Sequence, residues 1–157
     1  MSFLEEDWEF RFDLPRPSDP GDDELTRKNR LTLMSAFDSL ASGDADEFWA
    51  IFDPDVVFHE PSSLPYGGAH IGLKATQEAV SRMSGAYAQL RTTFEEITFA
   101  RDIALAYQTI SYRIKGNGNT GTMPVAELYR FKEGKVVEWR ALYSDPAKLA
   151  EAIQGEI

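Results

Sequence analysis

The 157-residue sequence contains no cysteine and only two histidines, and its 26 acidic residues outnumber its 16 basic ones. The absence of cysteine excludes disulfide bonds, thiol catalysis and thiolate metal sites. A formal net charge of -10 without any cluster of Lys and Arg argues against nucleic acid or an anionic membrane surface as a partner. No run of about 18 apolar residues could span a membrane, and the acidic first residues do not resemble a signal peptide. We therefore predict a soluble, cytoplasmic protein.

The two histidines, His59 and His70, do not form a metal-binding motif by themselves. They lie eleven residues apart, no third imidazole is available, and a zinc site would have to recruit Glu60 as well. The chain also has no glycine loop typical of nucleotide binding and no nucleophile elbow around a serine. We therefore predict neither a metal nor another cofactor.

Length and composition predict one globular domain, because 43% hydrophobic and 27% charged residues are ordinary values. Residues 1–24 form an acidic leader in which Trp8, Phe10 and Phe12 alternate with polar residues. We expect this leader to be partly ordered, as a short strand packed on the domain or on a second subunit, with a floppy tail as the alternative. The domain itself is expected over residues 25–157.

The remaining pattern alternates between helical and extended segments. Helical spacing of apolar residues predicts helices over 23–42 and from Gly72 onward; Asp44 is placed to cap a short helix between them, and Asp145 begins a last one. Extended segments are predicted at 56–60, 91–100, 103–115, 122–132 and 135–143. This order predicts an α+β fold, with a curved antiparallel sheet around three N-terminal helices.

Glu60 is the main candidate for acid-base chemistry. Strand alternation places Glu60 on one face with Val56 and Phe58, and places His59 on the other. Apolar neighbours raise the pKa of a carboxyl group, because desolvation disfavours its charged form. Pro61 keeps Glu60 extended and so fixes the direction of its side chain. A solvated carboxylate at the end of a strand is the alternative interpretation.

Three segments carry a family resemblance by their order and spacing: SGDADEFWAIFDPDVVFHEP, the turn PYGGAHIG before a helix, and the closing AELYRFKEGKVVEWRALYSDP. Together they resemble the NTF2-like superfamily, in particular its ketosteroid isomerase and SnoaL-like branch, over roughly residues 25 to 153. The resemblance implies a cone in which a strongly bent sheet encloses a single apolar pocket. It also implies a homodimer.

The resemblance further implies roles for two carboxylates. In the steroid isomerases a carboxylate directly before a proline moves the proton, and Glu60 is similar in position. A protonated acid on the strand before the final hairpin donates a hydrogen bond to the enolate oxygen. Glu127 is similar in position, and by alternation it shares an apolar face with Tyr129 and Phe131. The chain departs from these enzymes at Ala36, which stands where they have a tyrosine on the first helix.

Several further residues are predicted to line the pocket or bind the substrate: Phe58, Tyr66, His70, Tyr107, Thr109, Tyr129, Trp139, Ala141 and Tyr143. On the long strand, periodicity leaves open whether Tyr107 and Thr109 or their neighbours Ala106 and Gln108 face inward. His70 is expected near the pocket mouth, as a second acid or a substrate anchor.

These residues predict cofactor-independent acid-base chemistry, an isomerase or a cyclase, on a small apolar or polyketide-like carbonyl compound. Glu60 would remove a proton beside the carbonyl, and a neutral Glu127 would hydrogen-bond the enolate oxygen. The alternatives are a dehydratase or epoxide hydrolase using the same pocket, and a non-catalytic ligand-binding or dimerisation module. An enzyme would place both carboxylates in one dry pocket with at least one raised pKa, whereas a scaffold could pair Glu127 with Arg130 or Arg140.

Overall fold

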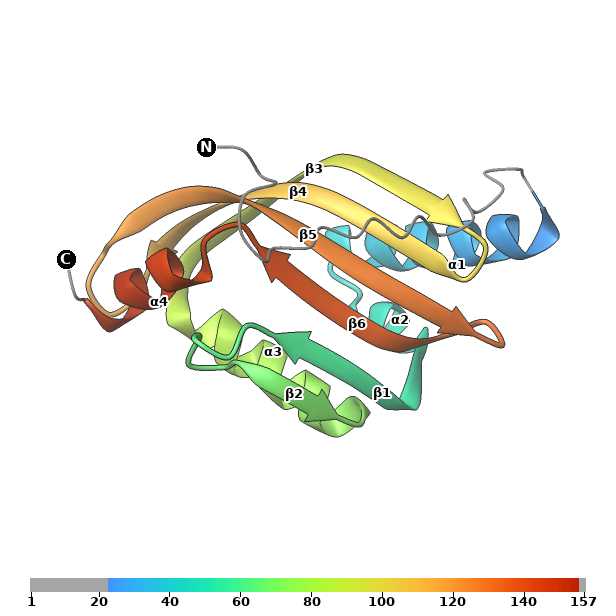
Figure 1. Ribbon diagram of the computed structural model, residues 1–157, viewed down its shortest axis with the longest axis horizontal. Coiled ribbons are helices and arrows are strands. Elements are labelled where there is room, and N and C mark those ends of the chain that lie inside the picture. Colours follow the sequence, from blue (N-terminus) through green and yellow to red (C-terminus); the bar gives the residue numbers. More distant parts are fainter. Residues whose placement is uncertain (1–22, 156–157) are drawn as a thin grey trace, which may run out of the picture.

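The computed structural model describes residues 23–155, which form an α+β fold built on a six-stranded curved sheet (Figure 1). The helices are α1 (Glu24–Ala41), α2 (Ala45–Trp49), α3 (Leu73–Ala86) and α4 (Pro146–Gln154). The strands are β1 (Phe52–Glu60), β2 (Gly68–Ile71), β3 (Tyr87–Ala100), β4 (Ile103–Ile114), β5 (Thr120–Lys132) and β6 (Lys135–Tyr143). The aromatic residues of the predicted leader, with their expected strand, lie outside the described residues.

The helices begin where short acidic side chains can cap them. Asp23, Asp44 and Asp145 each accept a hydrogen bond from the backbone N–H three residues later, at the starts of α1, α2 and α4. The predicted helix starts are thus confirmed. No helix within residues 23–155 is both long enough and apolar enough to cross a membrane.

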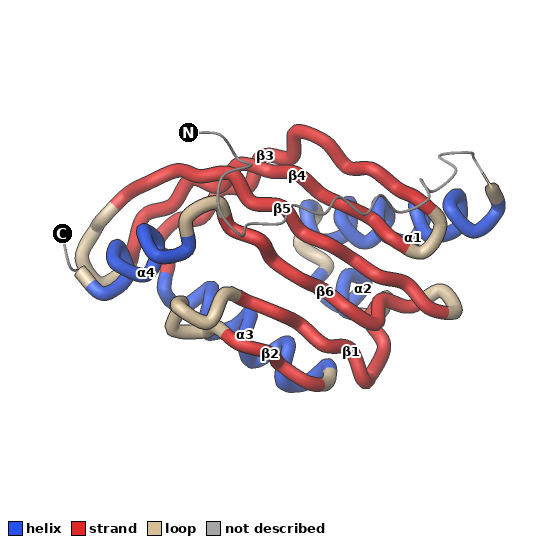
Figure 2. The backbone as a smooth tube through the Cα atoms, viewed as in Figure 1, coloured by secondary structure: helices blue, strands red, loops and turns tan. Residues whose placement is uncertain are grey.

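The strand order β2-β1-β6-β5-β4-β3 leaves the sheet open, with β2 and β3 at its edges. Helices α1, α2 and α3 lie on the concave side of the bend, and α4 lies beside the far end of the sheet (Figures 1 and 2). Side chains on the concave face of the sheet therefore point toward the helices. The positions of the functional side chains follow from which face each strand residue takes.

The sheet differs from the sequence prediction in two ways. The pairing of β1 with β6 is parallel, whereas all the other pairings are antiparallel. The sequence predicts only a turn around Gly67 and Gly68, but β2 follows this turn and pairs with β1. Four residues that begin with a glycine are too few for periodicity to detect, so β2 depends on the neighbouring strand for its formation.

The outer, convex face of the sheet exposes large apolar side chains. Leu105 and Tyr107 of β4 are each 44% exposed, and Leu142 of β6 is 51% exposed. An exposed apolar surface of this kind is common where a second protein binds. The homodimer expected from the family resemblance remains a prediction.

The turn between β1 and β2 is closely packed at Gly67. Its backbone N–H donates to the carbonyl of Leu64, whose own N–H donates to the carbonyl of Pro61. A Cβ atom at Gly67 would lie only 2.0 Å from the Pro61 carbonyl oxygen. The turn therefore requires glycine at this position because of backbone contact.

Replacing Gly67 by alanine should lower the free energy of unfolding by about 1 to 3 kcal/mol, the usual cost of overpacking. Urea unfolding would measure the loss. Gly85→Ala in α3 is the matched control, because nothing lies within 4 Å of a Cβ placed there and alanine favours helix. Equal stability of the wild-type protein and Gly67→Ala would contradict the close contact.

Candidate active site

An apolar cavity of about 440 Å³ lies between the concave face of the sheet and helices α1, α2 and α3. Its lining consists mainly of aromatic and aliphatic side chains, and two polar groups, the Gln108 amide and the Glu127 carboxylate, lie together at the sheet. The lining residues are Phe37, Leu40, Ala41, Ala45, Phe48, Trp49, Val80, Met83, Thr92, Phe94, Gln108, Glu127, Tyr129 and Trp139. A mostly apolar concavity with a few convergent polar groups is typical of a site for a small molecule.

Glu127 is held by three hydrogen-bond donors from the surrounding strands. The Gln108 side-chain amide donates to Oε1, and the Trp139 indole N–H donates to Oε2. The Tyr129 hydroxyl also donates to Oε2, at 2.7 Å. All three partners donate, which is the arrangement that suits an ionised carboxylate.

This arrangement leaves one acceptor position on Glu127. Each carboxylate oxygen has two lone pairs. Both lone pairs of Oε2 are occupied by Tyr129 and Trp139, whereas within residues 23–155 Oε1 accepts only from Gln108. Since Glu127 lines the cavity, Oε1 is the oxygen with acceptor capacity left for a bound molecule.

Glu60 lies at the end of β1 and is only 6% exposed. Its Oε1 accepts a long hydrogen bond of 3.5 Å from the Tyr143 hydroxyl, and its buried Oε2 has no hydrogen-bond partner within the described part of the chain. Burial, together with the smaller effect of the charge on Glu127, raises the pKa of Glu60 from 4.5 to about 8. The expected raised pKa is thus confirmed, and this carboxyl group is protonated at neutral pH.

The two carboxyl groups share one row of the sheet. Ala141 of β6 pairs with Glu127 of β5, and it is next to Glu60 because the preceding pair is His59 with Arg140. The side chain between the two carboxyl groups in this row is therefore only the methyl group of Ala141. The small size of Ala141 leaves the two carboxyl groups without a bulky side chain between them.

Buried tyrosines surround the other side of Glu60. The hydroxyl groups of Tyr66 and Tyr87 are 2.8 Å apart, and Tyr143 bonds Glu60. Burial is the main cause of a raised pKa in all three tyrosines, and the charge of Glu60 adds to it. These tyrosines therefore keep their protons at neutral pH and remain available as hydrogen-bond donors.

Of the residues predicted to line the pocket, Tyr129 and Trp139 do so. Phe58 is buried behind the lining, where its ring stacks on Trp139 with a centroid separation of 4.3 Å. Ala141 and Tyr143 lie beside Glu60, outside the cavity lining. The structure thus gathers most of the predicted residues around the two carboxyl groups, but only some of them face the cavity.

Four predicted positions need correction. Tyr107 and Thr109 lie on the outer face, because alternation along β4 turns the smaller Ala106 and the amide of Gln108 inward. Thr109 donates a hydrogen bond to Glu95 on that outer face. The other two residues, His70 and Tyr66, lie in the β1–β2 region and do not line the cavity. A ring nitrogen of His70 lies 2.8 Å from the Tyr66 carbonyl oxygen, and the Tyr66 side chain is buried against Tyr87.

Several residues that line the cavity carry no functional signal in the sequence. Phe37, Trp49 and Phe94 are apolar residues of ordinary periodic patterns, so nothing separates them from core residues in the sequence. For β4, the sequence left open whether Gln108 or the alternating residues Tyr107 and Thr109 face inward. Ala106 and Ile110 share a face with Gln108, and their apolar side chains favour that face as the inner one. Ala36, where the steroid isomerases have a tyrosine, is 2% exposed and supplies no hydroxyl group.

The described residues contain no group of three or more His, Asp or Glu side chains that could hold a metal ion. Arg130 and Arg140 both bond Glu138, and neither pairs with Glu127. The ion pair expected of a scaffold is therefore absent from Glu127 within residues 23–155. Its partners are neutral donors at the edge of a cavity.

The sequence profile of the SnoaL-like domain matches residues 34–139, which is more than half of the chain. The chain belongs to the SnoaL-like family. Its fold is that of NTF2-like proteins, and the family match confirms the predicted SnoaL-like branch of the superfamily. No curated protein matches the sequence.

Solved structures with the same fold are distant in sequence. An NTF2-like protein of unknown function from Burkholderia pseudomallei has 21% identity and a TM-score of 0.72, over 80% of this chain and 97% of that chain. A proposed SnoaL-like polyketide cyclase from Jannaschia sp. CCS1 has 18% identity and a TM-score of 0.70, over 85% and 96%. TerC, co-crystallized with polyporic acid, has 17% identity and a TM-score of 0.69, over 81% and 98%.

The raised pKa of Glu60 predicts how stability depends on pH. The folded protein binds this proton more tightly than the unfolded chain, so the free energy of unfolding should fall as pH rises from 4.5 to about 8. The expected decrease is on the order of a few kcal/mol. Glu60→Gln should flatten this dependence, and urea unfolding at several pH values would measure it. Parallel curves for the two proteins would show that Glu60 titrates normally.

Proposed function

We propose that this protein is a cofactor-independent acid-base enzyme, an isomerase or a cyclase, acting on a small apolar or polyketide-like carbonyl compound. The observation that best supports this proposal is the pair of carboxyl groups on one row of the sheet. Glu127 accepts hydrogen bonds from three donors and lines an apolar cavity, and the protonated Glu60 lies on the other side of Ala141. Two carboxyl groups whose environments favour different protonation states are typical of acid-base catalysis.

In this proposal Glu127 is the base, and the roles expected from the family resemblance are exchanged. The free lone pair of Oε1 accepts the proton beside the substrate carbonyl. As Glu127 becomes protonated, negative charge moves to the enolate oxygen. The Tyr129 hydroxyl can then rotate toward that oxygen, since a neutral acid is the poorer acceptor. A donor placed beside the reacting atoms in this way stabilises the charge that develops on the enolate.

Glu60 controls the total charge of the site. Below about pH 8 its carboxyl group is neutral, so the pair carries one negative charge, on Glu127. Above that pH a second charge appears near the place where the enolate forms, and like charges repel strongly in a medium of low dielectric. The neutral form of Glu60 therefore favours the reaction.

The cavity favours a neutral substrate with a flat apolar body. Among the described residues, its lining includes the aromatic rings of Phe37, Phe48, Trp49 and Phe94 and no Lys, Arg or His. An anionic substrate would meet Glu127 without a compensating cation. The complex of TerC with polyporic acid supports the general idea that this fold can hold a small organic molecule. A dehydratase or an epoxide hydrolase would use the same groups, and the reaction product distinguishes these outcomes.

Exchange of substrate protons for deuterium tests this proposal. A panel of neutral enolisable ketones is incubated with the protein in D₂O, and proton NMR follows the signal beside the carbonyl. Glu127→Gln should slow the exchange by about 10²- to 10⁴-fold, the usual contribution of a positioned base. The wild-type rate should decline above about pH 8 as Glu60 ionises, and Glu60→Gln should abolish that decline.

Glu95→Gln is the matched control, because this exposed glutamate bonds Thr109 on the outer face and is not among the residues that line the cavity. Circular dichroism would establish that every variant is folded. If a ketone binds but exchanges no faster than in buffer, or if Glu127→Gln exchanges as fast as the wild type, the cavity is a non-catalytic binding site.

A further inference from the structure

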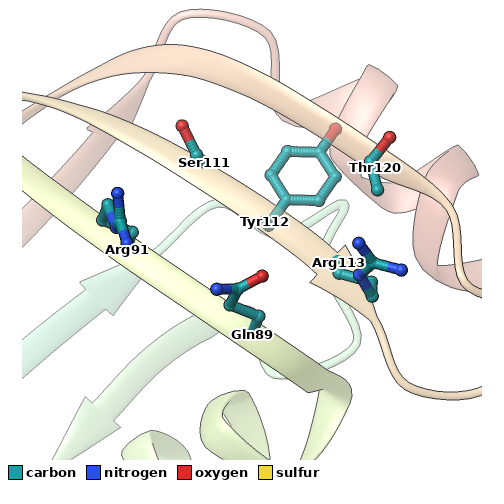
Figure 3. Close-up of a pocket in the computed structure, with 6 residues that line it drawn as sticks. All are labelled: Gln89, Arg91, Ser111, Tyr112, Arg113 and Thr120. Carbon is teal, nitrogen blue, oxygen red and sulfur yellow. The ribbon is translucent and has the colours of Figure 1, made fainter.

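A polar hollow, separate from the apolar cavity, lies on the opposite, outer face of the sheet. It has a volume of about 240 Å³ and is formed where β3, β4 and β5 run side by side near the β4–β5 turn (Figure 3). The lining residues are Gln89, Arg91, Ser111, Tyr112, Arg113 and Thr120. Within the described part of the chain, the hollow contains two guanidinium groups and no carboxylate.

The two arginines are placed diagonally across neighbouring strands. Arg91 of β3 pairs with Ser111 of β4, and Arg113 of β4 pairs with Gln89 of β3. Diagonal neighbours of this kind have Cβ atoms roughly 7 to 8 Å apart, a distance that long side chains can bridge. An oxyanion between them would receive N–H groups from both guanidinium forks.

Neither arginine side chain has an ion pair or hydrogen bond with another described residue, whereas other arginines on this sheet are paired. Arg130 and Arg140 both bond Glu138. The outer-face carboxylate of Glu95 accepts from Thr109 instead of reaching the hollow. Two unpaired like charges held side by side repel each other, and a bound anion would offset that repulsion.

Neutral donors complete the surroundings of the hollow. Thr120 of β5 pairs with Arg113, and Ser111 of β4 pairs with Arg91. The Ser111 hydroxyl donates a long hydrogen bond of 3.4 Å to Thr122, which an incoming anion would have to replace. In Figure 3 the polar ends of Arg91, Ser111 and Thr120 project from the same side of the sheet. Hydroxyl and guanidinium donors together are suited to a group with several acceptor oxygens, which favours a phosphate over a halide ion.

We propose that this hollow is a binding site for a phosphate group, either free or carried by a small metabolite, with Arg91 and Arg113 as its anchors. The overall charge of the chain is -10, so an anion is repelled by most of this protein. The hollow is a local exception to that repulsion. It is separate from the cavity, because Thr92, the residue after Arg91, faces the cavity from the other side of β3.

Titration with inorganic phosphate, at an ionic strength held constant with sodium chloride, tests this site. Heteronuclear NMR should show saturable shifts of the backbone signals around residues 89–91, 111–113 and 120, with a dissociation constant of roughly 1 to 10 mM, as for exposed ion pairs. Arg91→Gln and Arg113→Gln should each weaken binding about fivefold or more. Arg82→Gln, which removes the same charge from the exposed surface of α3, should leave binding unchanged.

Glycerol phosphate in a parallel titration distinguishes the two sources of the group. Tighter binding of the ester indicates a phosphorylated metabolite, and equal or weaker binding indicates free phosphate. The proposal is overturned if no shift saturates, or if Arg82→Gln weakens binding as much as the two hollow variants. It is also overturned if phosphate does not bind and the hollow variants change the oligomeric state, since acidic side chains of a second copy would then occupy the arginines.

Discussion

Two carboxyl groups in one apolar interior cannot both be charged without a large cost, and the arrangement of this site follows from that constraint. In this fold the two carboxyl groups receive different numbers of hydrogen bonds. Glu127 receives three donors, while Glu60 has one long hydrogen bond and an oxygen with no partner among the described residues. The proton therefore belongs to Glu60, and the negative charge is directed to the group that borders the cavity.

The inner face of the sheet makes this division possible by its choice of small residues. Ala104, Ala106 and Ala141 are all buried on that face, and Ala141 leaves no bulky side chain between the two carboxyl groups. Of the larger apolar residues of β4, Leu105 and Tyr107 lie outside, whereas Ile110 is buried. The stacked aromatic rings of Trp139 and Tyr129 line the cavity beside Glu127.

This distribution also explains how far the sequence could predict the structure. The helical spacing of apolar residues, the helix starts at Asp44 and Asp145 and the alternation around Glu60 were sufficient for most elements and for the fold, because each is a local pattern. Periodicity left the face of β4 open, since both faces carry large hydrophobic residues: Leu105 and Tyr107 lie outside, and Ile110 and Tyr112 lie inside. The protonation of the two glutamates depends on partners from distant strands, such as Gln108 and Trp139, which no local pattern reveals.

The parallel pairing of β1 with β6 has a consequence for how the site comes into being. Phe58 is placed beside Trp139, although most of the domain lies between them in sequence. Closing such a long loop is costly before the contacts that reward it are made, so pairings of this kind form late and slow the folding of a domain. Glu60 meets its partners only at that step. A chain that has formed only its helices and its β3–β5 meander therefore lacks the assembled carboxyl pair.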